Sequence, residues 1–370
     1  MFEISIAQRT RPTVYHDSIV KEGVKAFSVY NHTLLPTYYE SPEADYWHLI
    51  NNVSMWDVAC ERQVEITGPD AFKLVTLMTP RNISKCNVGQ GKYVPIVDHN
   101  GGMINDPILL KLAEDHYWLS IADTDLALWA KGLATGFGLD VNICEPDVSP
   151  LAIQGPNANK VCADLLGDWI YDLKYFWFRE FDLNGIPLVV QRSGWSKQGG
   201  LELYLRDGSM GNRLWEMVKE AGRPYNIKPG TPSTIERIEH GLYSQGNDMT
   251  IDNNPYEIGL GKYCAVDQEA YFIGKAALQR IKAEGVTQKL VGVMLPDVTI
   301  KGAKSWIPLT AAGNGSAAGK ITSLAYSPRL EKTIAFAMVP IEHTAVGTQL
   351  VAHTELGDTA AVVHETPFIK

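Results

Sequence analysis

Two segments of the chain resemble each other closely enough to limit the folds open to it. Residues 63–74, QVEITGPDAFKL, and residues 150–161, PLAIQGPNANKV, each read as a short apolar strand, a Gly-Pro break and the start of a helix. Proline suits the first turn of a helix, where its missing N–H leaves no hydrogen bond unmade. The repeat predicts two α+β modules built on one strand-turn-helix plan.

Other segments extend this prediction along the chain. Apolar residues at helical spacing predict helices over residues 125–137 and 213–221, and a third from Ser233 to about Gly246. Beyond residue 285, short apolar stretches alternate with Gly, Pro, Asn and Thr, which is typical of a small β-rich domain.

The composition excludes several classes of protein. With 370 residues, 45% of them hydrophobic and 20% charged, the chain can bury the cores of two or three domains. A net charge of −9 does not supply the basic face that nucleic acid requires. No stretch approaches the roughly 20 apolar residues of a membrane span, and the N-terminus lacks a signal-peptide pattern. We expect a cytoplasmic protein without nucleic-acid or membrane partners.

Cysteine and histidine are scattered. The five cysteines form no CxxC pair and the nine histidines no HExxH motif. Reduced thiols and the absence of a metal are therefore expected. The oligomeric state is left open, with a homodimer as one alternative.

One predicted strand contains an unusual pair of residues. The run Met103 to Leu110 belongs to an expected β-meander, yet it holds Asp106 followed by Pro107. Aspartate is unfavourable in a strand, and proline removes a ladder donor. This point is predicted to be an edge, a bulge or a functional site. A carboxylate that caps neighbouring amides is the structural alternative.

The stretch QRSGWSKQGGLELY, residues 191–204, is the strongest candidate site. Gly199 and Gly200 permit positive φ angles or a close approach of the backbone to a flat ligand. The alternation in LELY puts Glu202 and Tyr204 on one strand face. A hairpin turn with a solvated Glu and a packed Tyr explains the same pattern.

Aromatic residues are concentrated just before this stretch. Residues 169–178, WIYDLKYFWF, hold six rings, which serve either as core or as the wall of a pocket for a cation or flat ring. His32 stands alone at the end of a predicted strand, where a structural hydrogen bond is the simpler explanation.

Several motifs together resemble the glycine-cleavage aminomethyltransferases. They are RSGWSKQGGLEL, ERIEHGLYSQGNDMTIDNNPYEIGLG, FIGKAAL and SPRLEKTIAFAMV, in that order along the chain. Within this superfamily, YNHTLLP, WDVACERQVEITGPDA, DPILLKLA and GNDMT are more similar to the tetrahydrofolate-dependent dimethylsulfoniopropionate demethylase branch. Gln245 departs from the pattern, because many relatives have an aromatic residue there.

The resemblance implies an α+β fold of three domains around a central folate crevice. Two are ferredoxin-like α+β domains and the third is a C-terminal β-barrel-like domain. The expected boundaries are 1–52 with 143–228, 53–142 with 229–282, and 283–370.

The resemblance also implies roles for single residues. Glu202 is expected to bind the pterin, with Tyr93 close to it and Arg192 orienting Glu202 or meeting the glutamate tail. Asp106 is the expected catalytic residue, near the reactive nitrogen of the folate. The residues expected to contact the methyl donor are Trp195, Tyr204, Trp169, Phe176 and His32.

The implied activity is transfer of a methyl group from a sulfonium, dimethylsulfoniopropionate, to the co-substrate tetrahydrofolate. One alternative is folate-dependent O-demethylation of a methoxylated aromatic acid, for which His32 would serve as proton donor to a poor leaving group. Another is an aminomethyltransferase-like or non-catalytic folate-binding protein. Detection of methylated folate separates enzyme from binder, and a comparison of methyl donors separates the enzymes.

Overall fold

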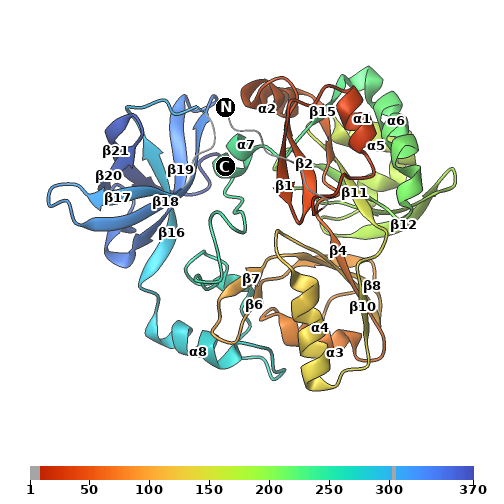
Figure 1. Cartoon of the computed structure of the whole chain (residues 1–370), viewed down its shortest axis with the longest axis horizontal. Coiled ribbons are helices and arrows are strands. Elements are labelled where there is room, and N and C mark those ends of the chain that lie inside the picture. The colour runs from red at the N-terminus through yellow and green to blue at the C-terminus, as the bar shows by residue number, and fades with distance from the viewer. Residues whose placement is uncertain (1–8, 302–305) are drawn as a thin grey trace. The chain divides into compact units, whose positions relative to one another are not determined.

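The computed structural model describes residues 9–301 and 306–370 (Figure 1). The chain divides into two compact units. The first holds the chain up to Leu74, together with Cys86–Tyr93 and Pro107–Ser233, and the second holds Val75–Lys85, Val94–Asp106 and Thr234–Lys370. The boundaries of the three expected domains stay a prediction.

A six-stranded sheet forms the centre of the first unit, in the order β12-β13-β14-β11-β3-β15. Neighbouring strands are antiparallel except β15 and β3, which are parallel. Every residue of β11 and β14 is buried, so these two strands lie in the core. The strands are β3 (Val53–Asp57), β11 (Ser149–Gln154), β12 (Phe178–Leu183), β13 (Ile186–Gln191), β14 (Gly200–Leu205) and β15 (Ile227–Gly230).

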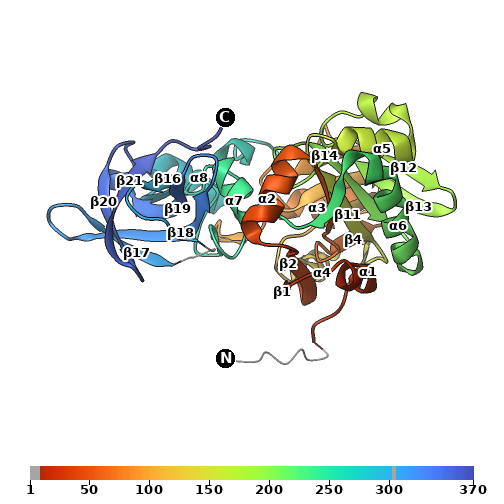
Figure 2. The ribbon, with the colours of Figure 1, turned by 90° about the horizontal axis from the view of Figure 1, so that it is seen from above.

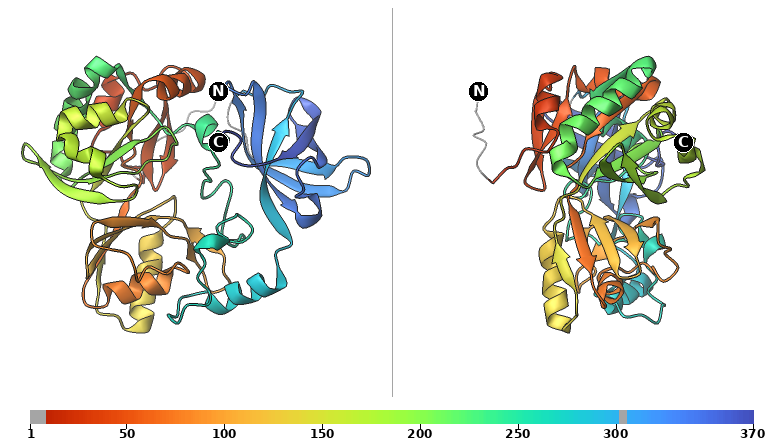
Figure 3. Two further views of the ribbon diagram at one scale, coloured as in Figure 1. Left: turned by 180° about the vertical axis from the view of Figure 1, so that it is seen from behind. Right: turned by 90° about the vertical axis from the view of Figure 1, so that its right-hand side faces the viewer.

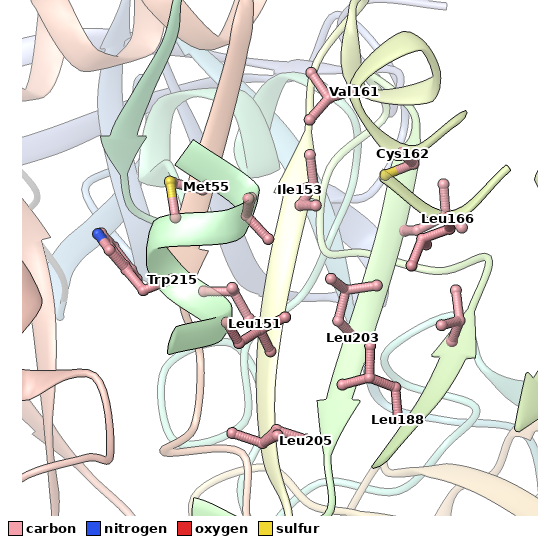
Figure 4. Packing of buried hydrophobic residues seen from close by; sticks show 14 of the residues in the cluster. Met55, Leu151, Ile153, Val161, Cys162, Leu166, Leu188, Leu203, Leu205 and Trp215 are labelled. Atoms are coloured by element: carbon pink, nitrogen blue, oxygen red, sulfur yellow. The ribbon is translucent and has the colours of Figure 1, made fainter. Parts of the chain in front are cut away.

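Two helices cover one face of this sheet (Figures 2 and 4). α5 (Ala158–Leu166) and α6 (Gly211–Gly222) pack their apolar sides against inward-facing residues of β11, β13 and β14. Leu151, Leu188 and Leu203 are almost fully buried in this cluster. Each stabilises the fold by about 1.5–3 kcal/mol through removal of apolar surface from water. The unit also contains α1 (His16–Lys21), α2 (Pro42–Asn51), β1 (Ala26–Tyr30), β2 (Thr33–Tyr38) and the short 3-10 helices η1 (Asp168–Asp172), η2 (Gly208–Met210) and η3 (Arg223–Tyr225).

A second, five-stranded sheet of the first unit has the order β10-β4-β9-β8-β5 and is antiparallel throughout. α4 runs beside it (Figure 3) and ends at Gly138, whose backbone is left-handed. The elements are β4 (Gln63–Thr67), β5 (Gln90–Tyr93), β8 (Ile108–Ala113), β9 (His116–Ser120), β10 (Asn142–Cys144) and α4 (Leu126–Phe137). The division between the units falls after Leu74, within α3 (Ala71–Met78).

The sequence repeat is confirmed as two strand-turn-helix modules, β4 to α3 and β11 to α5. The glycines of its Gly-Pro breaks have positive φ angles, 121° at Gly68 and 126° at Gly155. A Cβ at Gly68 would lie 2.8 Å from the carbonyl oxygen of Asp140, and one at Gly155 2.6 Å from that of Asn52. Only glycine fits such a close backbone crossing, and this explains why both modules keep it.

The second unit contains a closed barrel of six strands in the order β16-β19-β18-β17-β20-β21, coloured blue in Figure 1. Its interior is apolar, which confirms the β-rich domain expected after residue 285. The strands are β16 (Gln288–Leu295), β17 (Ile307–Ala311), β18 (Ala317–Ser327), β19 (Lys332–Pro340), β20 (Gln349–Thr354) and β21 (Gly357–His364). The remaining elements are β6 (Ile96–Val97), β7 (Met103–Asn105), α7 (Thr234–Glu239), α8 (Lys275–Glu284), η4 (Gly261–Tyr263) and η5 (Ile341–His343).

Two expectations about single elements are wrong. The helix that begins after Ser233 ends at Glu239 rather than near Gly246, because Gly241 turns into the left-handed region with a φ of 72°. The strand expected through residues 103–110 is two strands, β7 and β8, separated by Asp106 and Pro107. Pro107 has no N–H for a ladder, so the pairing ends there.

Candidate functional site

Glu202 lies in β14, at the middle of the six-stranded sheet, and is 6% exposed. It pairs with Ala152 of β11 on one side and Gln191 of β13 on the other. A carboxylate in such a place must be hydrogen-bonded, because burial of an unpaired charge is strongly unfavourable.

Two side chains, Ser193 and Tyr204, supply those hydrogen bonds, and both also contact Gln191. We call these four residues the Glu202 cluster: Gln191, Ser193, Glu202 and Tyr204. The Ser193 hydroxyl donates to Oε2 of Glu202, and the Tyr204 hydroxyl lies 3.1 Å from the same oxygen. Both hydroxyls also lie close to Oε1 of Gln191, at 3.1 Å and 3.2 Å respectively. Each hydroxyl therefore has a second acceptor at hand if a ligand takes Oε2 of Glu202.

Burial dominates the electrostatics of the cluster. It raises the pKa of Glu202 above its ordinary value, and the hydrogen bonds from Ser193 and Tyr204 offset only part of that effect. The pKa of Tyr204 is raised well above 10 by burial and by the neighbouring carboxylate. Tyr204 therefore acts as a hydrogen-bond donor rather than as a phenolate.

The ring of Tyr204 belongs to an apolar cluster with Trp118, whose ring centroid is 6.4 Å away, and with Phe178 and Val189. Tyr204 is 1% exposed, so its ring faces are covered and only the hydroxyl meets the polar cluster. Its expected part in the contact with a methyl donor stays a prediction.

The backbones of Phe176 and of Gly91, two residues before Tyr93, approach the Glu202 cluster. The amide of Gln191 donates to the carbonyl oxygen of Phe176 at 3.4 Å, and the N–H of Gly91 donates to the same oxygen. Gly91 belongs to β5, in which Tyr93 is the last residue and pairs with Ile108. A Cβ at Gly91 would lie 2.3 Å from the Gln191 amide nitrogen, so β5 touches the cluster directly.

The loop that carries Trp195 is held by Gln154. The amide nitrogen of Gln154 donates to the carbonyl of Ser193, and its oxygen accepts from the Ser196 hydroxyl at 2.8 Å. Gly200 begins β14 with a φ of 144°, and a Cβ there would lie 2.0 Å from the carbonyl oxygen of Ile153. Of the two adjacent glycines, Gly200 is thus needed for a close backbone contact, whereas Gly199 has a positive φ of 80° with open space where a Cβ would lie.

Trp169 belongs to η1, and Arg192, the residue after β13, forms hydrogen bonds with α5 and the η1 region. The guanidinium of Arg192 donates to the carbonyls of Ile170 and Leu173 and to Asn159, so its hydrogen bonds do not orient Glu202 as one expectation had it. The Trp169 indole donates to the carbonyl of Leu166 and has the Arg179 guanidinium 4.9 Å above its ring, with the Phe181 ring on it as well. The structure does not bring these two residues into the Glu202 cluster.

His32 is part of a two-residue turn between β1 and β2. Asn31 and His32 have φ angles of 49° and 59°, and the Asn31 side chain holds the turn through the carbonyl of Cys60. The His32 ring is 61% exposed and lies 3.7 Å from Asp125. This geometry is that of a surface turn.

Asp106 follows β7 directly. It is the last residue of Val94–Asp106, one of the three segments that make up the second unit. It is half-buried. Its catalytic role stays a prediction.

The arrangement suits recognition of a neutral ligand with paired N–H donors, since a buried carboxylate accepts such donors strongly. Among residues 9–301 and 306–370, no group of three or more His, Cys, Asp or Glu side chains could hold a metal ion, and no helix is long and apolar enough to cross a membrane.

Sequence reasoning missed Gln154, Gln191 and Ser193. Gln191 pairs with Glu202, so a correct guess of the β13–β14 register would have found Gln191. Ser193 lies two residues beyond the end of β13, outside that register.

Known proteins similar to this chain cover it almost completely. The family model described as the GCVT N-terminal domain matches residues 15–268, and that described as the glycine cleavage T-protein C-terminal barrel domain matches residues 288–370. The chain is 44% identical over 365 residues to dimethylsulfoniopropionate demethylase DmdA of Ruegeria pomeroyi, covering 99% of each chain. It is 30% identical over 348 residues to an aminomethyltransferase of Symbiobacterium thermophilum, covering 91% of each chain.

A solved structure confirms the fold class. The crystal structure of glycine cleavage system aminomethyltransferase T from Bartonella henselae matches with a TM-score of 0.86, covering 97% of this chain and 98% of that one. The sequence identity is 23%, so this likeness concerns the fold.

Proposed function

Because the chain belongs to the glycine cleavage T-protein family, we propose that it is a tetrahydrofolate-dependent demethylase acting on dimethylsulfoniopropionate. The observation that carries this proposal is its 44% identity to DmdA, over 99% of both chains. The products are methylthiopropionate and 5-methyltetrahydrofolate.

The chemistry needs alignment more than acid catalysis. The N5 amine of tetrahydrofolate attacks one methyl carbon of the sulfonium, the C–S bond breaks, and the sulfur leaves as a neutral thioether. N5 then carries both the methyl group and its own hydrogen, and loses that proton to give the product. No acid is required to expel the sulfur, so orientation and electrostatics account for the rate.

Glu202 is the residue we assign to the pterin. The amino group and ring N–H of a pterin present parallel donors, which match the two oxygens of a carboxylate. Oε2 already accepts from Ser193 and Tyr204, and both of these hydroxyls can turn to Gln191 instead. This alternative set of hydrogen bonds supports a carboxylate that is ordered before the ligand arrives.

The sulfonium keeps a fixed positive charge, which aromatic faces attract at roughly 0.5–2 kcal/mol each. Trp195 and Phe176 are the residues we favour for this contact, because both belong to segments tied to the Glu202 cluster. Asp106 is assigned to stabilise the charge that develops on N5 or to accept its proton.

The cytoplasm is the proposed location, since all five cysteines are free thiols. A homodimer is a further proposal, which light scattering tests.

The test is incubation of the purified protein with tetrahydrofolate and a panel of methyl donors, followed by mass spectrometry of the folates. We expect 5-methyltetrahydrofolate with dimethylsulfoniopropionate and none with methoxybenzoates or dimethylglycine. Methylated folate from an aryl ether alone would replace the proposal with O-demethylation. Folate binding without turnover of any donor would replace it with a binding protein.

A further inference from the structure

Gln245 carries a buried oxygen that has no hydrogen-bond partner within the described residues. The side chain is 9% exposed, and its amide nitrogen donates to the carbonyl oxygen of Ile104 at 3.3 Å. A carbonyl can only accept, so the atom facing Ile104 must be the nitrogen and the unpaired atom must be Oε1. Buried acceptors are nearly always paired, so this one points to a donor that arrives with a ligand.

The loop around Gln245 is too well anchored for the oxygen to find a partner by turning away. The buried carboxylate of Asp248 accepts from Arg237 at 2.8 Å, from the N–H of Ser244 at 3.0 Å, and from the hydroxyls of Thr322 and Ser323 at 2.7 Å and 2.6 Å. These bonds fix the segment on both sides of Gln245. The acceptor is therefore held in position in advance of any ligand.

The anchor of Gln245 lies in the segment that ends at Asp106. Ile104 is the middle residue of β7, and Asp106 follows that strand directly. The N–H of Met103 donates to the carbonyl of Asn253 at 2.8 Å, which ties the strand to the same loop region a second time. The Gln245 side chain is therefore bonded to the strand that Asp106 follows, at a residue two positions before Asp106.

We propose that Oε1 of Gln245 accepts a hydrogen bond from the reactive N5–H of tetrahydrofolate. This inference rests on the proposed methyl transfer and on the role assigned to Asp106. A hydrogen bond along N5–H turns the lone pair of N5 toward the methyl donor. As N5 gains the methyl group it becomes positively charged, and the same bond becomes charge-assisted and stronger. An interaction that strengthens in the transition state raises kcat. The amide does not take the proton, which leaves N5 to Asp106 or water.

The test compares three variants of the full chain. Gln245→Leu removes the acceptor, and Gln245→Met removes it with a side chain of similar length that fills the space. Asn247→Leu is the matched control, because it removes an exposed amide of the same loop. For each we would measure the melting temperature, kcat, and KM for tetrahydrofolate and for dimethylsulfoniopropionate.

For both Gln245 variants we expect kcat/KM for tetrahydrofolate to fall about 10- to 100-fold, the range for a hydrogen bond to a charged group. We expect KM for dimethylsulfoniopropionate to change less than about twofold, and Asn247→Leu to match the wild type. The inference is overturned if a Gln245 variant with a wild-type melting temperature keeps its kcat/KM for tetrahydrofolate. It is also overturned if the loss is confined to KM for the sulfonium.

The two proposals fail in different ways. A wild-type protein that makes no 5-methyltetrahydrofolate from any donor defeats the proposed function. A wild-type protein that makes it while the Gln245 variants do so equally well defeats only this inference.

Discussion

Gln191 and Glu202 face each other across the adjacent strands β13 and β14, and the hydroxyls of Ser193 and Tyr204 lie between their side-chain oxygens. Each of the two hydroxyls thus has two acceptors within hydrogen-bond distance, the neutral amide oxygen of Gln191 and the carboxylate oxygen of Glu202. A ligand that binds Glu202 can displace these hydroxyls to Gln191 without leaving any group unpaired. The cluster therefore combines a fixed carboxylate with adjustable hydrogen bonds.

Glu202→Gln is expected to weaken tetrahydrofolate binding by roughly 10- to 100-fold, because the amide replaces one acceptor oxygen by a donor and removes the charge. Isothermal titration with tetrahydrofolate measures the change. Glu216→Gln, an exposed position of α6, is the matched control and should bind normally. An unchanged affinity in Glu202→Gln would show that the pterin binds elsewhere.

The pH dependence of folate binding should follow the protonation of Glu202. Burial raises the pKa of this carboxyl, so its ionised form is lost at a higher pH than that of an ordinary glutamate. Tetrahydrofolate affinity is therefore expected to fall as pH is lowered, and to begin falling at a higher pH than it would with an ordinary glutamate. Titrations from pH 8 to pH 5 test this, and the fall attributed to Glu202 should be absent in Glu202→Gln.

Asp106→Asn is expected to lower kcat by about 10²- to 10⁴-fold, the range for loss of a positioned proton acceptor, with a smaller effect on folate affinity. Single-turnover formation of 5-methyltetrahydrofolate measures the chemical step. Asp115→Asn, an exposed position after β8, serves as the control. Full turnover in Asp106→Asn would remove Asp106 from the mechanism.

Arg192→Lys is expected to destabilise the fold rather than to act first on the folate site. The guanidinium joins two backbone carbonyls of the η1 region and Asn159, and a lysine cannot reach all three. We expect a loss of about 1–3 kcal/mol in the free energy of unfolding, because partly buried acceptors are left unpaired. Urea unfolding measures it. A variant of wild-type stability that binds folate poorly would instead favour a direct role for Arg192 in binding.

Asp57 should make the stability of the fold depend on pH. Burial raises its pKa from 3.8 to about 7, although the Thr13 hydroxyl and the N–H of Ala59 donate to it. The folded protein thus holds this proton more tightly than the unfolded chain, so the contribution of Asp57 to stability is lost as pH rises from about 4 to 7. A shift of this size corresponds to on the order of 4 kcal/mol.

The measurement is urea unfolding of the wild type and of Asp57→Asn at pH 5 and pH 8, with the exposed Asp252→Asn as control. Relative to Asp57→Asn, the wild type should lose stability between the two values. If the difference in the free energy of unfolding between the wild type and Asp57→Asn is the same at pH 5 and pH 8, titration of Asp57 is ruled out.

The sequence predicts a local feature well where only one residue type fits the space or the backbone conformation at that position. Gly68 and Gly155 mark the two strand-to-helix turns because no side chain fits the backbone crossing there. Asp106 and Pro107 signal a break for a similarly local reason, although the sequence does not show that β7 and β8 are separate strands.

The sequence is less informative where partners are distant in the chain. Arg192 belongs to the stretch of residues 191–204 that the sequence predicts to be a binding site, yet its guanidinium donates to the backbone carbonyl of Ile170. Gln191 becomes part of the Glu202 cluster only through the register of β13 on β14, which motif reading does not supply.

The Asp248 network has a consequence for attempts to shorten the chain. Two of its four donors, Thr322 and Ser323, come from barrel strand β18, whereas Arg237 and Ser244 precede the barrel. A truncation before residue 288 would leave a buried carboxylate half-satisfied beside Gln245. The two matched family segments are therefore not interchangeable modules, and a barrel grafted from a relative must bring hydroxyls at these two positions to restore the loop.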